Sequence, residues 1–183
     1  MFQVLNNSMN KALVVASLCL VAVVMLSGCV EPVEEGALYK NDIYGFSVEP
    51  PAGWTIEEGA SMAIVEFVAP TDIDTQNNIN IVAENAEWYT LDEYFQATKQ
   101  SMQTFFPEID YKLIDEGSLT INGVDARYMG SEWGIEDYQF KTKQIIIMQE
   151  DGTAFVITYS ALPNTYRYNI VEFDRLVSTF RFT

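Results

Sequence analysis

Hydrophobic and polar positions alternate with a period of two in several segments after residue 38, which is typical of half-buried β-strands. Residues 44–48 follow this pattern, and Ala63, Val65 and Phe67 share one face of another expected strand. Residues 144–148 are almost wholly apolar, as expected for a central strand that is covered on both faces. Further strands are expected at residues 38–40, from residue 54, and at residues 79–83.

Two segments have the helical period instead. Thr90-Leu91-Asp92-Glu93 is a capping box, which predicts a helix that starts at Thr90 and ends at Pro107. Its buried side is expected to carry Leu91, Tyr94, Phe95, Thr98, Met102 and Phe105. A second helix is expected from about Tyr166 to Thr179, with Ile170, Phe173, Val177 and Phe180 on its buried side.

Two short polar segments predict hairpin turns. Asn122-Gly123 is the clearer one, because both residues tolerate the positive φ that a two-residue turn requires. Residues 149–153 predict a second hairpin, between strands Tyr138–Met148 and Ala154–Ser160. Hairpin-connected strands with one helix in the middle and one at the end predict an α+β domain with a mostly antiparallel sheet.

The N-terminal segment has a different pattern. Residues 12–26 are apolar apart from Ser17 and Cys19, and Ser27, Gly28 and Cys29 follow directly. This order is typical of a secretory signal peptide, and the final cysteine makes it look like a lipobox. A single transmembrane anchor is the alternative, although the run is shorter than the ~20 apolar residues that span a bilayer. Translation could also start at Met9.

We therefore expect a lipoprotein signal peptide over residues 1–28, an acidic tether over 29–37 and one folded domain over 38–183. Cys29 would carry a diacylglyceryl lipid, and two acyl chains are enough for stable membrane anchoring. The domain would then lie outside the cytoplasm, tethered to the membrane surface. With Cys19 removed and Cys29 acylated, it would have neither a free thiol nor a disulfide.

Charge is one-sided: the chain has 26 acidic and 10 basic residues, for a net charge of −16. Nucleic acids need basic surfaces, so we expect no nucleic-acid partner. The acidic surface has two interpretations. It can serve solubility, including in a saline habitat, or it can attract cations or a basic partner protein.

Candidate chemistry is sparse. The chain has no histidine, which excludes Ser-His-Asp catalysis and histidine-ligated zinc, and no glycine-rich phosphate loop is present. The loop over residues 72–78 begins like a calcium loop, with Asp72 and Asp74 at alternate positions, but it lacks the later glycine and glutamate. A second acidic cluster contains Glu132, Glu136 and Asp137. We interpret the first as a solvated loop before a strand and the second as an exposed bend between strands, with metal binding as the alternative for both. We expect no enzymatic activity and no resident cofactor.

Several short motifs resemble the PsbP-like family, named for the extrinsic subunit of photosystem II. They are Tyr39-Lys40-Asn41, Tyr44–Val48 and Pro50–Trp54 near the start, and Pro163, Tyr166 and Ser178–Phe182 near the end. The resemblance implies an α/β/α sandwich around an antiparallel sheet, covering residues 38–183. Photosynthetic members stabilise a membrane complex and help to retain calcium and chloride, and others bind protein partners, including a small GTPase. This chain has no histidine to match the metal-binding histidines of the photosynthetic branch.

The leading functional hypothesis is a non-enzymatic, lipid-anchored accessory domain that docks on a membrane or envelope partner. The alternative is a lipoprotein that binds a cation or small ligand through calcium-type oxygen ligands. A carboxylate-based hydrolase is a third option, and it would need a deep pocket with two converging carboxylates.

Overall fold

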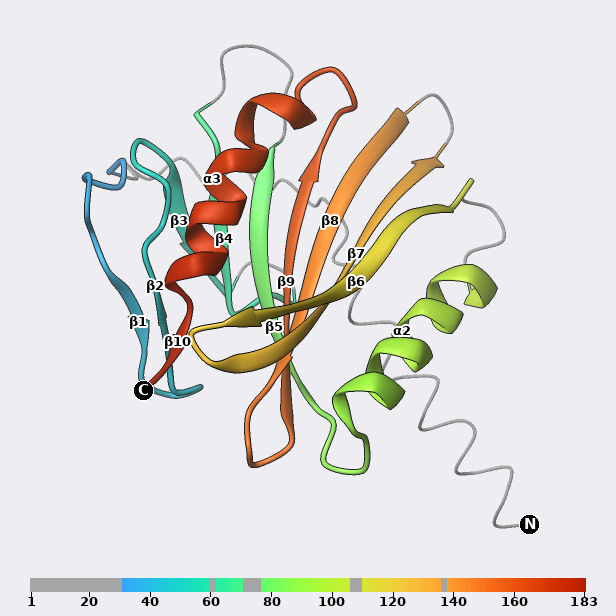
Figure 1. The fold of residues 1–183 in the computed structure, drawn as a ribbon. Helices are drawn as coiled ribbons and strands as arrows, with labels where there is room; N and C mark the ends of the chain where they lie inside the picture. The colour runs from blue at the N-terminus through green and yellow to red at the C-terminus, as the bar shows by residue number, and fades with distance from the viewer. Residues whose placement is uncertain (1–30, 60–61, 71–76, 106–109, 136–137) are drawn as a thin grey trace.

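A seven-stranded antiparallel sheet forms the middle layer of the protein (Figure 1). The computed structural model describes residues 31–59, 62–70, 77–105, 110–135 and 138–183. In spatial order the strands are β3 (Thr55–Glu58), β4 (Val65–Val68), β5 (Asn78–Asn85), β9 (Thr153–Ala161), β8 (Tyr138–Met148), β7 (Val124–Ile135) and β6 (Lys112–Ile121). Each neighbouring pair is antiparallel, which confirms the expected sheet.

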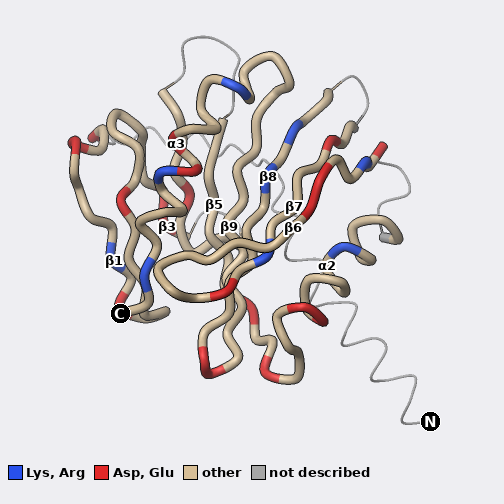
Figure 2. The backbone as a smooth tube through the Cα atoms, viewed as in Figure 1, with Lys and Arg blue, Asp and Glu red and all other residues tan. Residues whose placement is uncertain are grey.

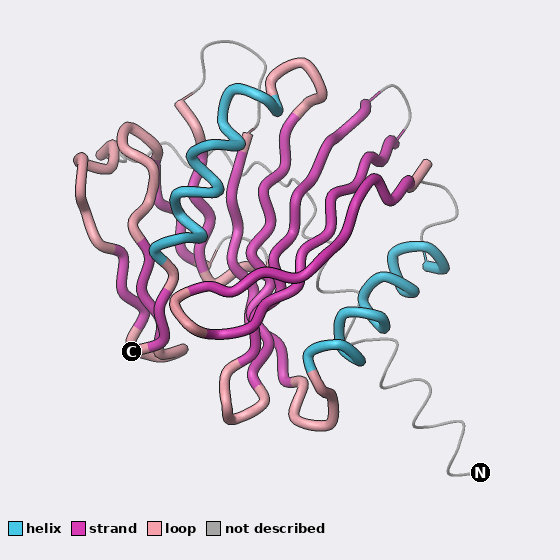
Figure 3. Tube along the Cα trace, in the orientation of Figure 1, coloured by secondary structure: helices cyan, strands magenta, loops and turns pink. Residues whose placement is uncertain are grey.

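Two helices cover opposite faces of this sheet: α2 (Leu91–Phe105) and α3 (Tyr166–Thr179) (Figure 3). Ile145 and Ile147 of β8 belong to the same core cluster as Phe173 of α3. Ile146, between them, packs instead with Phe95 of α2. Because successive residues of a strand point to opposite faces, the two helices lie on different sides. The predicted α/β/α sandwich is therefore confirmed.

A small three-stranded sheet adds to the α3 side. Its strands are β1 (Tyr39–Asn41), β2 (Phe46–Val48) and β10 (Arg181–Phe182), in the order β1-β2-β10. The Phe46 ring stacks on Phe180, with the ring centroids 5.5 Å apart, and meets Phe155 edge-on at the same distance. The last two residues of the Ser178–Phe182 motif thus form strand β10, which pairs with β2. Strand β2 is shorter than predicted, because the chain turns at Gly45, which has a φ of 67°.

The capping box at Thr90 forms as predicted. The Thr90 amide donates to Glu93 Oε2 at 2.9 Å, and the Glu93 amide donates to Thr90 Oγ1 at 3.3 Å. The hydrogen bonds that the Thr90 amide and hydroxyl donate to the exposed Glu93 carboxyl lower its pKa. The predicted buried residues Tyr94, Phe95 and Met102 are buried, and so is Thr98. Leu91 is partly buried against the same cluster.

Helix α3 spans the predicted residues, and Phe173, Val177 and the following Phe180 are buried as expected. Ile170 is only partly buried, whereas Leu176, which the pattern did not single out, is fully buried. The 14-residue helix packs on β9, β2 and β6.

Both predicted hairpins form. Asn122 and Gly123 have φ values of 48° and 86°, which are the left-handed conformations that the turn demands. The Asn122 side chain also donates to the carbonyls of Ser178 and Phe180, at 3.0 and 2.7 Å. The hairpin tip is therefore fastened to the end of α3.

The N-terminal part of the described chain is packed against the domain. The Val33 amide donates to the Trp54 carbonyl at 2.7 Å, and the Val33 side chain is buried. The boundary between tether and domain stays a prediction, but ordered contacts begin before Leu38. Of the helices in the described ranges, none has the length and apolar character that crossing a membrane requires.

Candidate functional site

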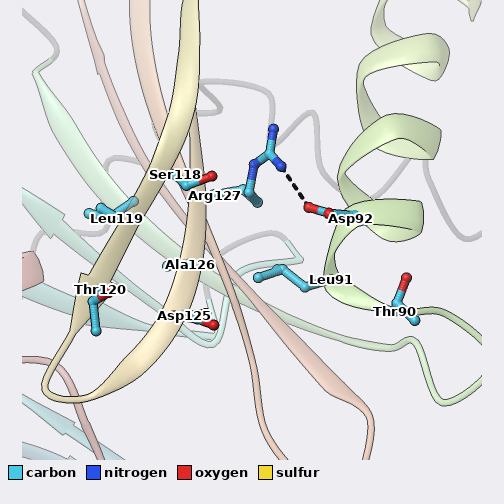
Figure 4. Close-up of a pocket in the computed structure, with 9 residues that line it drawn as sticks. All are labelled: Thr90, Leu91, Asp92, Ser118, Leu119, Thr120, Asp125, Ala126 and Arg127. Carbon is cyan, nitrogen blue, oxygen red and sulfur yellow. Dashed lines mark hydrogen bonds and ion pairs between the residues drawn. The ribbon is translucent and has the colours of Figure 1, made fainter.

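A surface pocket of about 680 Å³ lies between the start of α2 and the β6–β7 hairpin (Figure 4). The residues that line it are Thr90, Leu91, Asp92, Ser118, Leu119, Thr120, Asp125, Ala126 and Arg127. They come from three elements: the first turn of α2, strand β6 and strand β7. The pocket is lined by the charged side chains of Asp92, Asp125 and Arg127.

Among the described residues, Arg127 is the only basic one that lines this pocket, and its guanidinium is held by contacts within the protein. Its Nη1 donates to Asp92 Oδ1 at 2.6 Å, and its Nε donates to the Gly117 carbonyl at 3.2 Å. The guanidinium also lies 4.5 Å from the centre of the Phe95 ring, within cation–π range. These contacts tie α2 to the sheet. We therefore interpret Arg127 as a structural clamp rather than as a ligand-binding group.

The sheet face beneath α2 carries an unusual line of polar residues. Glu57, Glu66, Asn80, Thr158 and Gln144 are consecutive cross-strand partners in β3, β4, β5, β9 and β8. We call these five residues the polar row. Helix α2 packs chiefly on β7 and β8, at the far end of the row from Glu57. The row therefore runs from the β3 edge of the sheet towards the helix.

Burial along the polar row increases from the edge inward. Glu57 and Glu66 are half-buried, whereas Asn80, Thr158 and Gln144 are exposed by only 4%, 7% and 3%. The Gln144 amide donates to Thr158 Oγ1 at 3.1 Å, so the inner end is partly self-satisfied. Within the described parts of the chain, Asn80 Oδ1 has no hydrogen-bond partner, and neither does Oδ1 of the nearby Asn78. Unpaired buried oxygens are costly in a folded protein, so they call for an explanation.

A buried acid, Glu84, lies on the same face of the sheet, near the end of β5. Tyr94 of α2 donates a short hydrogen bond to Glu84 Oε2, while Glu84 Oε1 has no partner. Burial raises the pKa of the Glu84 carboxyl, and the Tyr94 hydrogen bond opposes that rise. The same carboxylate, together with burial, raises the pKa of the Tyr94 hydroxyl far above its usual value.

Glu66 is perturbed for a similar reason. Burial raises the pKa of its carboxyl, the negative charge of Glu57 raises it further, and a hydrogen bond from Asn78 lowers it. Glu57 and Glu66 are direct cross-strand partners, whose side chains start ~5 Å apart. Two carboxylates and two amide oxygens are thus grouped where strands β3, β4 and β5 meet.

A second distinctive surface lies at the end of the molecule formed by three loops. The β8–β9 hairpin contacts the β5–α2 loop, because the Ala86 amide donates to the Gly152 carbonyl at 2.9 Å. The β1–β2 turn lies beside the same hairpin, since a side chain at Gly45 would come within 3.9 Å of the Gln149 amide. Trp88 and Ile43 are 85% and 88% exposed there. We call this end the apolar tip.

The apolar tip is also acidic. Asp42, Glu87, Glu150 and Asp151 belong to its three loops. Figure 2 shows acidic residues on the loops between β5 and α2 and between β8 and β9. One of these acidic residues, Asp42, forms an ion pair with Lys40 at 2.6 Å. Exposed apolar residues ringed by charge are typical of protein-docking surfaces.

Most of the residues that the sequence singled out lie outside the described residues: Cys29, Asp72, Asp74, Glu136 and Asp137. Their roles in lipidation and metal binding stay predictions. Glu132 is described, and it pairs with Lys141 at 3.0 Å across β7 and β8. Within the described ranges, no three histidine, cysteine or acidic residues are close enough together to hold a metal ion.

The sequence analysis missed both the polar row and the apolar tip. The alternation of asparagine and isoleucine in residues 78–81 was a usable signal, but it is also what a strand with one hydrated face would have. The row becomes visible only when the register aligns Glu57, Glu66 and Asn80 from three strands. Trp88 was one of many aromatics, and most of the others are buried or stacked.

No family model and no curated protein sequence matches the chain. Solved structures do. The chain is similar to the cyanobacterial PsbP protein, CyanoP, of Synechocystis, with a TM-score of 0.64 and 15% identity over 89% of this chain and 99% of that one. It is also similar to LpqN of Mycobacterium tuberculosis, a protein involved in cell envelope biogenesis, with a TM-score of 0.60 and 15% identity over 84% and 90% of the two chains.

A third similar structure is the Ran-binding protein Mog1p of Saccharomyces cerevisiae, with a TM-score of 0.57 and 10% identity over 84% of this chain and 96% of that one. At such identities the likeness establishes the fold and not the activity. None of these three proteins is named for a reaction that it catalyses. Two helices on opposite faces of a seven-stranded antiparallel sheet give this chain the PsbP-like fold, which it shares with CyanoP, LpqN and Mog1p.

Proposed function

We propose that this protein is a lipid-anchored, extracytoplasmic accessory domain that docks on a membrane or envelope protein through its apolar tip. It would be held at the membrane by a diacylglyceryl group on Cys29, and it would catalyse no reaction. The single observation that carries the docking proposal is the exposure of Trp88 and Ile43 on adjoining loops at one end of the fold. Tryptophan is enriched among the residues that contribute most to the binding energy of protein interfaces.

The position of the tip relative to the N-terminal segment supports this proposal. Val33 pairs with Trp54, which directly precedes β3, and Thr55 is level with Val68 and Asn78 at the start of β5. Trp88 follows shortly after Asn85, the last residue of β5. A strand of eight residues spans ~26 Å, so the tip lies at the opposite end of the sheet from Val33. A domain tethered through the residues before Val33 would thus present its tip on the side away from the tether.

The charge of the tip indicates the chemistry of the partner. Four acidic side chains surround the exposed Trp88 and Ile43. A complementary partner would present lysine or arginine side chains around an apolar pocket that receives the indole. Such a contact would weaken as the salt concentration rises, because exposed charges are screened.

Anchoring is tested by mass spectrometry of the N-terminus of the membrane fraction, with Cys29→Ala as the comparison. We expect an acylated N-terminal cysteine in the native protein and release of the Cys29→Ala variant from the membrane. An unmodified Cys29 in a chain that still begins at Met1 or Met9 would refute the anchor. This experiment does not depend on docking.

Docking is tested separately by placing a photo-crosslinking amino acid at Trp88, at Ile43 and, as the control, at Tyr168 of α3, in the full chain on native membranes. Tyr168 is also largely exposed, at 62%, but it lies outside the tip. We expect the same discrete crosslinked protein from the first two sites, none from the third, and a lower yield at high salt. Equal crosslinking from all three sites, or none from the tip, would contradict the proposal.

A further inference from the structure

The outer end of the polar row brings oxygen atoms from three strands to one place. Glu57, Glu66 and Asn80 are consecutive partners across β3, β4 and β5, so their side chains project from the same face of the sheet. Neighbouring Cβ atoms in such a row are ~5 Å apart, which allows one small ligand to contact adjacent members. Asn78 lies two residues before Asn80 in β5 and therefore faces the same side.

Two of these side chains are buried and carry an amide oxygen without a hydrogen bond. Asn78 and Asn80 are each 4% exposed, and among the described residues the Oδ1 atom of each has no hydrogen-bond partner. Buried amide oxygens in folded proteins normally accept a hydrogen bond from the protein or from water, so these two are open to a ligand. Both unpaired atoms are oxygens. A ligand at this place would therefore have to supply hydrogen-bond donors or positive charge.

The two carboxylates argue for positive charge. Glu57 and Glu66 are adjacent, and within the described parts of the chain no lysine or arginine forms an ion pair with either of them. Like charges directly opposite each other on neighbouring strands repel and destabilise the pair. A bound cation would offset this repulsion, because it attracts the ionised form of each acid.

The set of atoms is also the right chemical type. Carboxylate and amide oxygens are the ligands that hard divalent cations such as Ca²⁺ and Mg²⁺ prefer. Zinc or copper would need nitrogen or sulfur ligands, and the chain has no histidine. The burial gradient provides an entry route, since Glu57 and Glu66 are half-buried at the sheet edge and the asparagines lie further in.

We propose that Glu66 and Asn80 bind a hard divalent cation, with Glu57 at the entrance and Asn78 holding the Glu66 carboxylate. The site is distinct from the predicted loop at Asp72 and Asp74 and from the cluster at Glu132. It depends on neither the lipid anchor nor the apolar tip. The site spans the edge strand β3 and its neighbours β4 and β5, and a cation that binds the folded protein stabilises it.

Isothermal titration calorimetry of the full-length, detergent-solubilised protein tests the site. CaCl₂, MgCl₂ and MnCl₂ are titrated separately, after chelation of residual metal. We expect saturable one-to-one binding of at least one of these ions, and an unfolding midpoint that rises with its concentration. Affinity should fall as the pH falls, because protons compete with the metal for Glu66. No heat and no change in the midpoint with any of the three at millimolar concentration would overturn the proposal.

Variants then locate the site. Glu66→Gln removes the charge and keeps the shape, and we expect binding at least tenfold weaker. Asn80→Leu removes the unpaired oxygen, and we expect it to weaken binding while leaving stability without metal unchanged or higher, which loss of a merely structural residue would not do. Glu132→Gln is the matched control and should bind like the native protein. If binding instead survives Glu66→Gln and Asn80→Leu but is lost in the Asp72→Asn, Asp74→Asn double variant, the proposed site is wrong.

Discussion

The two faces of the central sheet are built from the same strands but have opposite chemistry. On the α3 face, Val65, Ile81, Ile157 and Ile145 are cross-strand partners, and each is 0–1% exposed. The residues next to them in the same four strands point to the α2 face, and they are Glu66, Asn80, Thr158 and Gln144. The α3 face therefore carries the larger hydrophobic cluster of the domain, and the α2 face a smaller one under the helix. The α2 face, where α2 covers mainly β7 and β8, is free to serve binding.

The largest contrast is expected between matched substitutions on one strand. Phe155→Ala removes a fully buried ring that contacts Phe46, Phe180 and Phe182 on the α3 face, and we expect a loss of about 3–5 kcal/mol of unfolding free energy. Thr158→Val on the α2 face should cost about 1 kcal/mol, since it removes one side-chain hydrogen bond. Urea unfolding measures both. Equal losses would mean that the two faces contribute alike to stability.

A smaller effect is expected where the β6–β7 hairpin joins the α3 side. Asn122→Ala forces a residue with a Cβ to keep the left-handed φ and removes two hydrogen bonds to the end of α3, so we expect a loss of about 1–3 kcal/mol. Asn122→Gly is the control, because glycine accepts the φ but cannot make the bonds. Urea unfolding of the two variants separates the cost of the turn from that of the fastening. No loss in either would contradict the role given to this side chain.

The attachment of α2 to the sheet through Arg127 should contribute less to the free energy of unfolding. Arg127→Met keeps an apolar stem over the sheet but removes the ion pair with Asp92 and the contact with the Phe95 ring, and we expect a loss of about 1 kcal/mol. The more exposed pair of Lys40 and Asp42 provides the comparison. Lys40→Met should change the unfolding midpoint hardly at all. Hydrogen exchange along α2 would show whether the helix alone is loosened.

The smallest effect is expected in how the free energy of unfolding changes with pH. Burial raises the folded-state pKa of Glu84 and of Glu66 above the ordinary value of 4.5, so both groups favour folding most below pH 4.5 and lose that contribution as the pH rises through the folded pKa. Glu84→Gln keeps the Tyr94 hydrogen bond without the charge. We expect its stability to decline less than that of the native protein between pH 4 and pH 8. A steeper decline in the variant would reverse the assigned sign.

The elements that short-range chemistry determines could be predicted from the sequence. The capping box at Thr90 and the turn at Asn122-Gly123 involve neighbours in the chain, and both form as expected. The antiparallel sheet followed from the hairpins. The polar row could not be predicted, because Glu57 and Glu66 become neighbours of Asn80 only through the pairing of three strands. Likewise, nothing in the residues around Trp88 distinguishes an exposed tryptophan from a core one.

Strand β10 has a consequence for the order in which this protein is made and folded. Its two residues pair with β2, and the amide of Thr183 donates to the Gly45 carbonyl at 2.9 Å, so the N-terminal small sheet is completed by the C-terminal end of the sequence. A nascent chain that emerges residue by residue cannot complete that sheet before β10 has been synthesised. Under the extracytoplasmic location proposed above, this delay would help to keep the chain open for translocation across the membrane.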